Sequence, residues 1–264
     1  MEVKDIERSI ITTYKSKIFN RFLKGVKEFD LVSDGDKIAI CISGGKDSFL
    51  LAKCMQELQK HSKYKFSLEY IVMDPGYTKD NVDKIKSNLS LLGIEATFFE
   101  SNIFSMVKDT NSICYLCARK RRGFLYAKAK ELGCNKIALG HHFDDVIETI
   151  LLNILYAGEY KTMMPKIKST NFSDMQLVRP LYYVKEKDII SWKNHCGLEF
   201  IDCACTVTKR QIGKRKEVKE LINNLRSIDK NIDIHILKSS TNVNLDAVLG
   251  YKTNGISKNF MDSY

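Results

Sequence analysis

Long apolar segments and proline are both scarce in this 264-residue chain, which contains only three prolines. Its longest apolar runs fall far short of the roughly 20 residues that span a bilayer. The first ten residues, MEVKDIERSI, lack the apolar core of a signal peptide. These absences argue against a membrane protein. With 44% hydrophobic residues, the sequence instead predicts a folded, soluble, cytoplasmic protein with no membrane partner.

The sequence also lacks internal repeats, low-complexity linkers and any clear boundary between independent domains. We therefore expect a main domain over residues 31–230, preceded by a helix over residues 1–30. A small C-terminal helical extension follows, and the tail over residues 231–264 is left unassigned. Apolar residues recur at every fourth position from Ile6 to Val26, which is typical of one helix face. That face would cover the core or a partner subunit, and we expect a homodimer.

Acidic residues are outnumbered, because 32 Asp and Glu stand against 42 Lys and Arg, a formal charge of +10. Such an excess favours a polyanionic partner such as a nucleic acid. A solvated, lysine-rich surface without function would give the same composition. The chain also has eight cysteines. In a protein expected to be cytosolic, these are better explained as thiols or metal ligands than as disulfides.

Strand and helix patterns alternate from residue 37 onward. A buried strand is predicted at residues 37–41, and further strands at 66–73, 95–99, 136–139 and 177–181. Helices are predicted at residues 79–92, 117–132, 144–156, 185–195 and 214–227. A basic loop is expected at residues 161–168. This alternation predicts an α/β fold, in which a parallel sheet carries helices on both faces. Ligands of such sheets bind at the carboxyl ends of the strands.

The most informative segment is SGGKDS, which follows the first predicted strand and precedes an apolar helix face. A glycine turn at a helix start presents backbone N–H groups to an anion, and the helix dipole favours negative charge there. The spacing matches neither the Walker pattern nor the GxGxxG dinucleotide fingerprint. We expect a phosphate site, and the alternative is a tight turn that binds nothing. The residues of this segment are Ser43, Gly44, Gly45, Lys46, Asp47 and Ser48.

A second polar segment, GHHFDDVIE, lies at another predicted strand end. Gly140 and His141 follow the strand at residues 136–139, and Asp144 and Asp145 open the next helix. Carboxylates in that position suit the helix dipole and could hold a magnesium ion that bridges phosphates. The alternative is that Asp144 only caps the helix.

Four of the cysteines occur in two spaced pairs. Cys114 and Cys117 lie three residues apart at a predicted helix start, so both can reach one metal centre or form a redox disulfide. Cys203 and Cys205 alternate along an extended segment, so both thiols can face one site. The remaining four cysteines have no such neighbour.

A basic run, Arg119, Lys120, Arg121 and Arg122, follows the first cysteine pair. It is either a solvated helix end or a phosphate track that guides RNA. We favour the track, which Lys161 would extend. Because the run is remote in sequence from the predicted phosphate loop, we expect it to lie apart from the nucleotide pocket.

The chain resembles the tRNA 2-thiocytidine synthetase group of the PP-loop ATP pyrophosphatase superfamily. The resemblance is carried by four motifs: SGGKDS, CYLCARKRRG, ALGHHFDDVIET and RPL. The fold of that superfamily is adenine nucleotide alpha-hydrolase-like. The motifs stand in the family's order over most of the chain. The resemblance implies adenylation of a tRNA base with ATP and Mg²⁺, and it makes Asp47 and Asp145 the expected catalytic residues. It also implies an adenosine pocket that includes Met73 and Asp74.

The same resemblance implies a [4Fe-4S] cluster with an open iron that carries sulfide. Cys114 and Cys117 match the family's first two ligands, and either Cys203 or Cys205 matches the third. The implied activity is thiolation of cytidine 32 of tRNA, with tRNA and a cysteine desulfurase or other sulfide donor as partners. The alternatives are a related thiolase acting on uridine or on a small-molecule sulfur acceptor, and a non-catalytic nucleotide- or zinc-binding RNA module.

Overall fold

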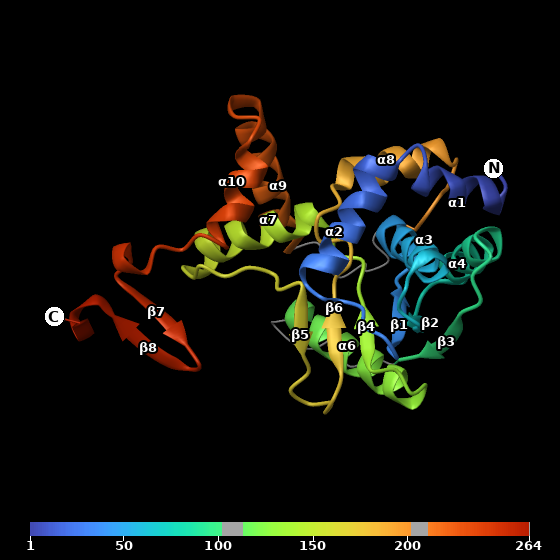
Figure 1. The fold of residues 1–264 in the computed structure, drawn as a ribbon, viewed down its shortest axis with the longest axis horizontal. Helices are drawn as coiled ribbons and strands as arrows, with labels where there is room; N and C mark the ends of the chain where they lie inside the picture. The colour runs from blue at the N-terminus through green and yellow to red at the C-terminus, as the bar shows by residue number, and fades with distance from the viewer. Residues whose placement is uncertain (102–112, 202–210, 264) are drawn as a thin grey trace. The chain divides into compact units, whose positions relative to one another are not determined.

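The structure, a computed structural model, describes residues 1–101, 113–201 and 211–263 (Figure 1). It divides into two compact units. The first comprises Met1–Val146 and Met163–Lys214, and the second comprises Ile147–Thr162 and Arg215–Tyr264. No helix in the described ranges is long and apolar enough to cross a membrane.

The first unit is built on a sheet that has six strands among the described residues, in the order β3-β2-β1-β4-β6-β5. The strands are β1 (Lys37–Ile42), β2 (Ser67–Asp74), β3 (Thr97–Glu100), β4 (Lys136–Ala138), β5 (Lys166–Lys168) and β6 (Gln176–Val178). All neighbours pair in parallel except β5, which runs antiparallel to β6. The predicted α/β sheet is thus confirmed.

Two expectations about this sheet need correction. The sheet is not wholly parallel, and the loop expected at residues 161–168 ends in the edge strand β5. The cause is tertiary, because Ile167 pairs with Leu177 in the next strand. The lysines at both ends of this three-residue strand are typical of a sheet edge. So short a segment, however, does not by itself predict a strand.

Chain order reverses between β1 and β4, which pair side by side although β2 and β3 lie between them in sequence. In open α/β sheets, ligands bind at the carboxyl ends of the strands beside such a reversal. The SGGKDS segment follows β1, and Gly140 follows β4 by two residues. The topology therefore brings the two predicted polar segments to one edge of the sheet.

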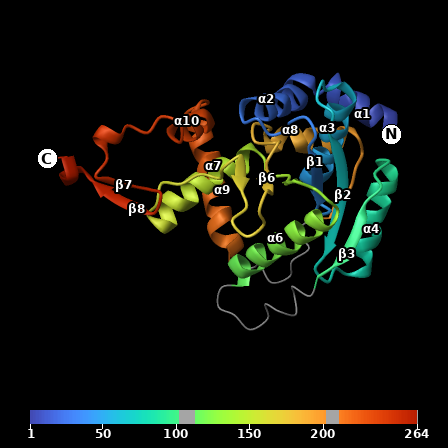
Figure 2. The same cartoon turned by 60° about the horizontal axis from the view of Figure 1, so that its bottom comes forward.

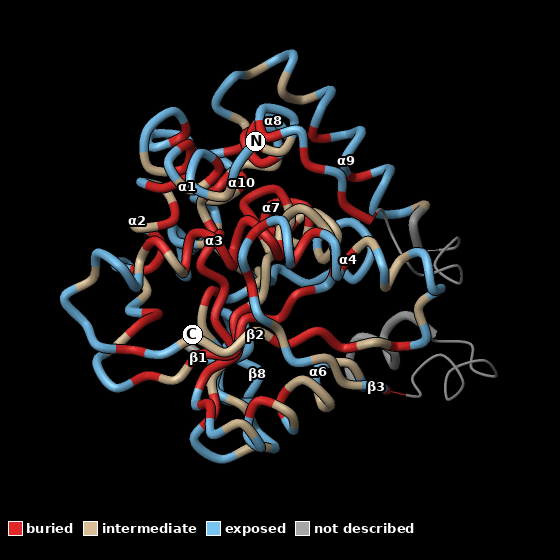
Figure 3. The backbone as a smooth tube through the Cα atoms, turned by 90° about the vertical axis from the view of Figure 1, so that its right-hand side faces the viewer, coloured by how far each residue is buried: buried red, intermediate tan, exposed pale blue. Residues whose placement is uncertain are grey.

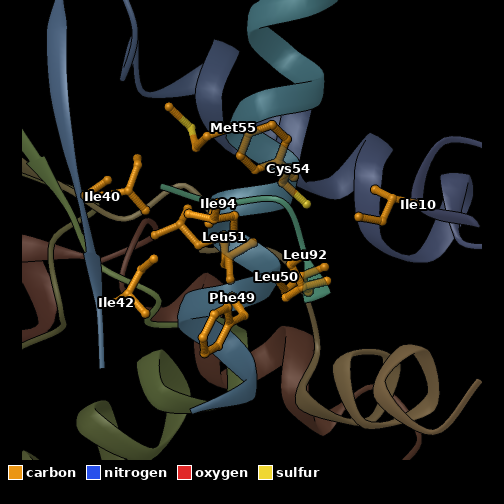
Figure 4. Packing of buried hydrophobic residues seen from close by; sticks show 14 of the residues in the cluster. Ile10, Ile40, Ile42, Phe49, Leu50, Leu51, Cys54, Met55, Leu92 and Ile94 are labelled. Atoms are coloured by element: carbon orange, nitrogen blue, oxygen red, sulfur yellow. The ribbon is translucent and has the colours of Figure 1, made fainter. Parts of the chain in front are cut away.

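The sheet has an apolar layer on each face. Ile38, Ile40 and Ile42 of β1 pack with α3 (Lys46–His61), whereas Ala39 and Cys41 pack with α6 (Ile113–Glu131) on the other face. This alternation is what the two-residue period of a strand dictates. Figure 2 shows α3 and α6 on opposite sides of the strands, and Figure 4 shows Ile40 and Ile42 pointing toward Phe49 and Leu51 of α3.

The N-terminal segment is helical, as predicted, in α1 (Val3–Ile11), a π-helical turn (Lys15–Phe19) and α2 (Asn20–Glu28). Its apolar stripe is buried in the core that includes α3 and α8 (Glu186–His195). Figure 3 shows this burial along the chain. The stripe thus covers the core of its own chain and gives no argument for the homodimer, which stays a prediction.

The other predicted helices are also present, including α4 (Lys79–Leu91) and α7 (Phe143–Leu152), which a π-helical turn (Asn153–Ala157) extends. Helix α6 begins at Ile113, before its predicted start, so Cys114 and Cys117 both lie within the helix. The expected helix at residues 214–227 corresponds to α9 (Gln211–Ile228).

The second unit holds most of α9 together with α10 (Ile232–Ser239) and a hairpin of β7 (Gly250–Thr253) and β8 (Ile256–Asn259). The hairpin lies in the tail that sequence reasoning left unassigned. Its turn residues, Asn254 and Gly255, both have positive φ. An Asn-Gly pair of this kind is a strong hairpin signal, so the element could have been predicted.

A buried ion pair joins the starts of β1 and β4. The Lys136 ammonium lies 2.6 Å from a carboxylate oxygen of Asp36, and both residues are buried. Asp36 also accepts hydrogen bonds from the Asn135 side chain, at 2.8 Å, and from the Ser33 backbone, at 2.6 Å. Removing one partner of such a pair leaves the other charge buried without compensation.

We predict that Asp36→Ala lowers the free energy of unfolding by about 3–5 kcal/mol, measured by urea denaturation. The matched control is Glu199→Ala, which removes the exposed Lys84–Glu199 pair at 3.1 Å and should change stability little. Equal losses in the two variants would contradict this account of the sheet's anchoring.

Candidate functional site

The SGGKDS segment forms a tight loop between β1 and α3. Gly44 has a φ of +87°, and a Cβ there would lie 2.9 Å from a side-chain carbon of Ile85 and still closer to Ile201. Ser48 closes the loop, because its hydroxyl accepts the Ser43 backbone N–H at 3.2 Å and donates to the Gly45 carbonyl at 2.8 Å. The first N–H groups of α3 have no partner within the helix. The loop therefore has the geometry of an anion site.

Gly140 brings the end of β4 against this loop. A Cβ at Gly140 would stand 3.0 Å from the Asp47 carbonyl carbon and 3.0 Å from the Ser48 nitrogen. Only glycine fits so close to another backbone. The segment that follows Gly140 is consequently held beside the first turn of α3.

His142, and not Asp144, caps α7. The His142 backbone N–H donates to an Asp145 carboxylate oxygen at 2.9 Å, and the Asp145 N–H donates to His142 Nδ1 at 3.4 Å. This reciprocal pattern is a capping box. It leaves the imidazole proton on Nε2, which lies 3.8 Å from Asp47 Oδ1. Asp144 instead accepts the Glu186 backbone N–H at 2.7 Å and so holds the start of α8.

Lys46 and Asp47 form the charged part of the loop. The Lys46 ammonium lies 3.3 Å from Asp47 and 3.3 Å from Glu186. Burial alone would lower the pKa of Lys46, but the two carboxylates outweigh it and raise that pKa. Burial raises the pKa of Asp47, and the neighbouring His142 and Lys46 oppose that shift only in part. A divalent cation at Asp47 would favour its charged form.

A pocket of about 450 Å³ opens beside the loop, at the carboxyl ends of the strands. Nine predicted site residues line it: Ser43, Asp47, Ser48, Met73, Arg121, Arg122, Gly140, His141 and Asp145. The structure thus assembles predicted residues from four separate segments of the first unit. Within the described residues, no three His, Cys, Asp or Glu side chains are grouped so as to hold a metal ion by themselves.

The expectation that the basic run lies apart from the nucleotide pocket is wrong. Helix α6 packs on the sheet through Tyr126 and Ala129, and this packing brings Arg121 and Arg122 into the same lining as the loop. Separation along the sequence did not predict separation in space, because helix α6 packs across the sheet and brings the basic run to the loop. Lys161 belongs to the second unit, where its ammonium lies 3.2 Å from Glu159.

Five predicted cofactor-binding residues do not line the pocket: Gly44, Gly45, Lys46, Asp74 and Asp144. Asp74 shapes it indirectly, because one carboxylate oxygen accepts the backbone N–H groups of Gly76 and Tyr77 at 2.8 and 2.7 Å. The turn places Tyr77 in the lining. Its hydroxyl donates to the Ser43 carbonyl at 3.4 Å.

Sequence reasoning gave a role neither to Tyr77 nor to Arg179, which also lines the pocket. Signals for both were present in the sequence. Tyr77 ends the turn Asp-Pro-Gly-Tyr, and Arg179 begins the RPL motif.

The predicted cluster ligands are described only in part. Cys203 and Cys205 lie outside the described residues, and Cys114, Cys117 and Arg119 lie in α6 without a description of their side chains. The four other cysteines, Cys41, Cys54, Cys134 and Cys196, are buried free thiols. Burial raises the pKa of all four, to about 11 for Cys134. A metal ligand must be a thiolate, so these four are unsuited to hold a cluster.

Comparisons with known proteins give a consistent result. A family model described as a PP-loop domain matches residues 14–221. A curated tRNA-cytidine(32) 2-sulfurtransferase of Citrifermentans bemidjiense is 35% identical over 232 residues, which cover 86% of this chain and 91% of that protein. The enzyme of the same name from Pelobacter propionicus is 35% identical over 237 residues, or 88% of each chain.

Among solved structures, the U34-tRNA thiolase NcsA from Methanococcus maripaludis, with its [4Fe-4S] cluster, matches with a TM-score of 0.68. The match has 22% sequence identity and covers 84% of this chain and 76% of that one. At this identity the likeness concerns the fold. It confirms the predicted fold class.

We predict that Gly44→Ala abolishes tight ATP binding, with a loss of at least about tenfold in affinity measured by calorimetry, because the new Cβ forces the loop away from Ile201. The control is Gly133→Ala. Gly133 also has a positive φ, +73°, but its Cβ would meet nothing within 4 Å. Gly133→Ala should lose about 1 kcal/mol of stability from backbone strain alone, and Gly44→Ala should lose more because its Cβ also clashes with side chains. Equal ATP affinities would show that the loop is not the phosphate site.

Proposed function

The chain belongs to the PP-loop domain family and, within it, to the tRNA-cytidine(32) 2-sulfurtransferases, and from this membership we propose that it converts cytidine 32 of tRNA to 2-thiocytidine with ATP. One observation carries the proposal beyond family membership. A single pocket contains residues of the glycine loop, two carboxylates and three arginines, contributed by separate segments of the chain. Activation of an RNA base by ATP needs these groups together.

The loop and the start of α3 would bind the terminal phosphates of ATP. Backbone N–H groups at the start of α3 supply donors, and the helix dipole favours the negative charge. Asp47 and Asp145 both line the pocket and would hold Mg²⁺ together with phosphate oxygens and water. This fits the absence of a complete protein cage among the described residues, because Mg²⁺ at phosphates commonly uses one or two carboxylates.

The arginines would bring the RNA to the nucleotide. Arg121 and Arg122 line the pocket, and Lys120 beside them is exposed. Cations in that position can contact the RNA backbone while an unstacked loop base enters the pocket. In this proposal Arg121 and Arg122 lie close to both the RNA backbone and the bound nucleotide.

The chemistry divides into two displacements. The C2 oxygen of the base attacks the α-phosphate of ATP, and pyrophosphate leaves toward the loop. The adenylated oxygen is then a good leaving group, so sulfide adds to C2 and AMP departs with that oxygen. Lys46, Asp47 and Asp145 would orient and neutralise the phosphates in the first step. The sulfide would come from a cysteine desulfurase or another donor.

The cysteines that are not buried free thiols are the candidate ligands of a [4Fe-4S] cluster. Four of the eight cysteines are buried free thiols, which leaves Cys114, Cys117, Cys203 and Cys205. Cys117 precedes Arg121 by one helical turn, roughly 6 Å along the axis, so ligands on α6 would lie close to the pocket. When bound by three thiolates, the cluster supplies an iron with an open position for sulfide.

The names of the curated relatives favour cytidine 32 as the target over the uridine alternative. Nucleoside mass spectrometry tests this choice. A deletion strain should lack 2-thiocytidine and keep its thiolated uridines, and a loss of thiouridine alone would contradict the assignment.

We predict that Cys114→Ala and Cys117→Ala each abolish the visible absorbance of anaerobically purified protein and its formation of 2-thiocytidine. One of Cys203→Ala and Cys205→Ala should do the same. The controls are Cys54→Ala and Cys196→Ala, which remove buried thiols and should keep both signals at somewhat lower stability. A Cys114→Ala protein that retains four irons and thiolates tRNA would rule out this ligand set.

A further inference from the structure

Arg179 stands at the same edge of the sheet as the phosphate loop. It follows β6, which pairs with β4, and the Leu139 N–H after β4 donates to the carbonyl of Val178, the last residue of β6, at 3.0 Å. The carboxyl ends of β4 and β6 therefore meet beside the pocket. Arg179 lines that pocket although only 5% of its surface is exposed.

The guanidinium of Arg179 is only partly satisfied by the protein. Its Nη1 donates to the Met164 carbonyl, whereas its buried Nε has no hydrogen-bond partner in the described part of the chain. Across the same residues, no carboxylate lies within ion-pair distance of Arg179. A buried donor and a buried charge without partners are costly, and a bound anion would satisfy both.

Charges of both signs act on Arg179, and the effect of the Arg122 cation exceeds that of the Asp145 carboxylate. Burial, and after it the charge of Arg122, lower the pKa of Arg179 to about 10. Both arginines line the pocket that faces Asp47 and Ser48. Two cations in one pocket repel each other until an anion binds between them. The electrostatics of this wall thus favour an anionic ligand.

We propose that Arg179, which follows β6 and is separated by β4 from the strand that precedes the SGGKDS loop, binds a phosphate group of the bound nucleotide. The proposal rests on the ATP-dependent function proposed above and assigns a specific contact within it. The loop accounts for a terminal pyrophosphate, so the α-phosphate is the group that Arg179 would contact. The phosphate could belong to the nucleotide or to the RNA backbone, and the burial of Arg179 favours the nucleotide. A side chain that is only 5% exposed contacts a small ligand inside the pocket more readily than a polynucleotide backbone outside it.

The test compares two ligands on one variant. Arg179→Met should weaken ATP binding about ten- to a hundredfold, the loss expected when a charged hydrogen bond is removed. Its affinity for pyrophosphate, which the loop would hold alone, should stay within about twofold of the wild type. The control is Arg21→Met, which removes a partly exposed arginine outside the pocket lining, paired with Asp188 at 2.9 Å, and should change neither affinity.

A second measurement separates ligand binding from a structural role. Without ligand, Arg179→Met should unfold at the same temperature as the wild type or higher, because it removes a buried charge that has no ion-pair partner. Arg179→Lys keeps the charge but not the planar fork, and it should weaken ATP binding by less than Arg179→Met does, again without loss of pyrophosphate affinity.

Several results would overturn the proposal. Equal weakening of ATP and pyrophosphate, or an Arg179→Met protein that fails to fold, would mark the arginine as structural. Loss of tRNA affinity with unchanged ATP affinity would assign it to the RNA backbone. A wild-type protein that binds neither ATP nor pyrophosphate would reject the proposed function itself, and this contact with it.

Discussion

The close approach of Gly140 to the backbone of Asp47 and Ser48 is the constraint on which the site depends. At 3.0 Å from a hypothetical Cβ, this contact admits no side chain, so it fixes the end of β4 against the first turn of α3. The neighbouring groups follow from it. His142 can cap α7 and still face Asp47, and Asp145 enters the same pocket as the loop.

The position of this contact follows from the sheet. β1 and β4 are neighbours at the point where strand order reverses, so their carboxyl ends leave an opening that later strands do not cover. Helix α6 closes one side of the opening with Arg121 and Arg122. The same helix carries the cysteine pair at residues 114 and 117. A single element thereby connects the nucleotide pocket with the segment proposed to hold the cluster.

Much of this could be predicted from the sequence. The SGGKDS and GHHFDD motifs were sufficient to place a glycine loop and two carboxylates at strand ends, because glycine turns and helix starts are determined by the local sequence. The inclusion of Arg121 and Arg122 in the pocket could not be predicted, since it depends on how α6 packs across the sheet. Likewise, the His142 cap and the Lys46–Glu186 pair require knowing which segments meet in space. The hairpin turn at Asn254-Gly255 differs from these features, because its signal is local and the sequence alone was enough to predict it.

The most direct test of the central claim follows the oxygen that the proposed chemistry removes. Anaerobic protein with its cluster would be supplied with ATP, sulfide and tRNA in which the C2 oxygen of cytidine 32 is ¹⁸O-labelled. The account predicts one AMP and one pyrophosphate for each 2-thiocytidine formed, with the label in the phosphate of AMP. Formation of ADP and orthophosphate, or release of the label into water, would contradict it.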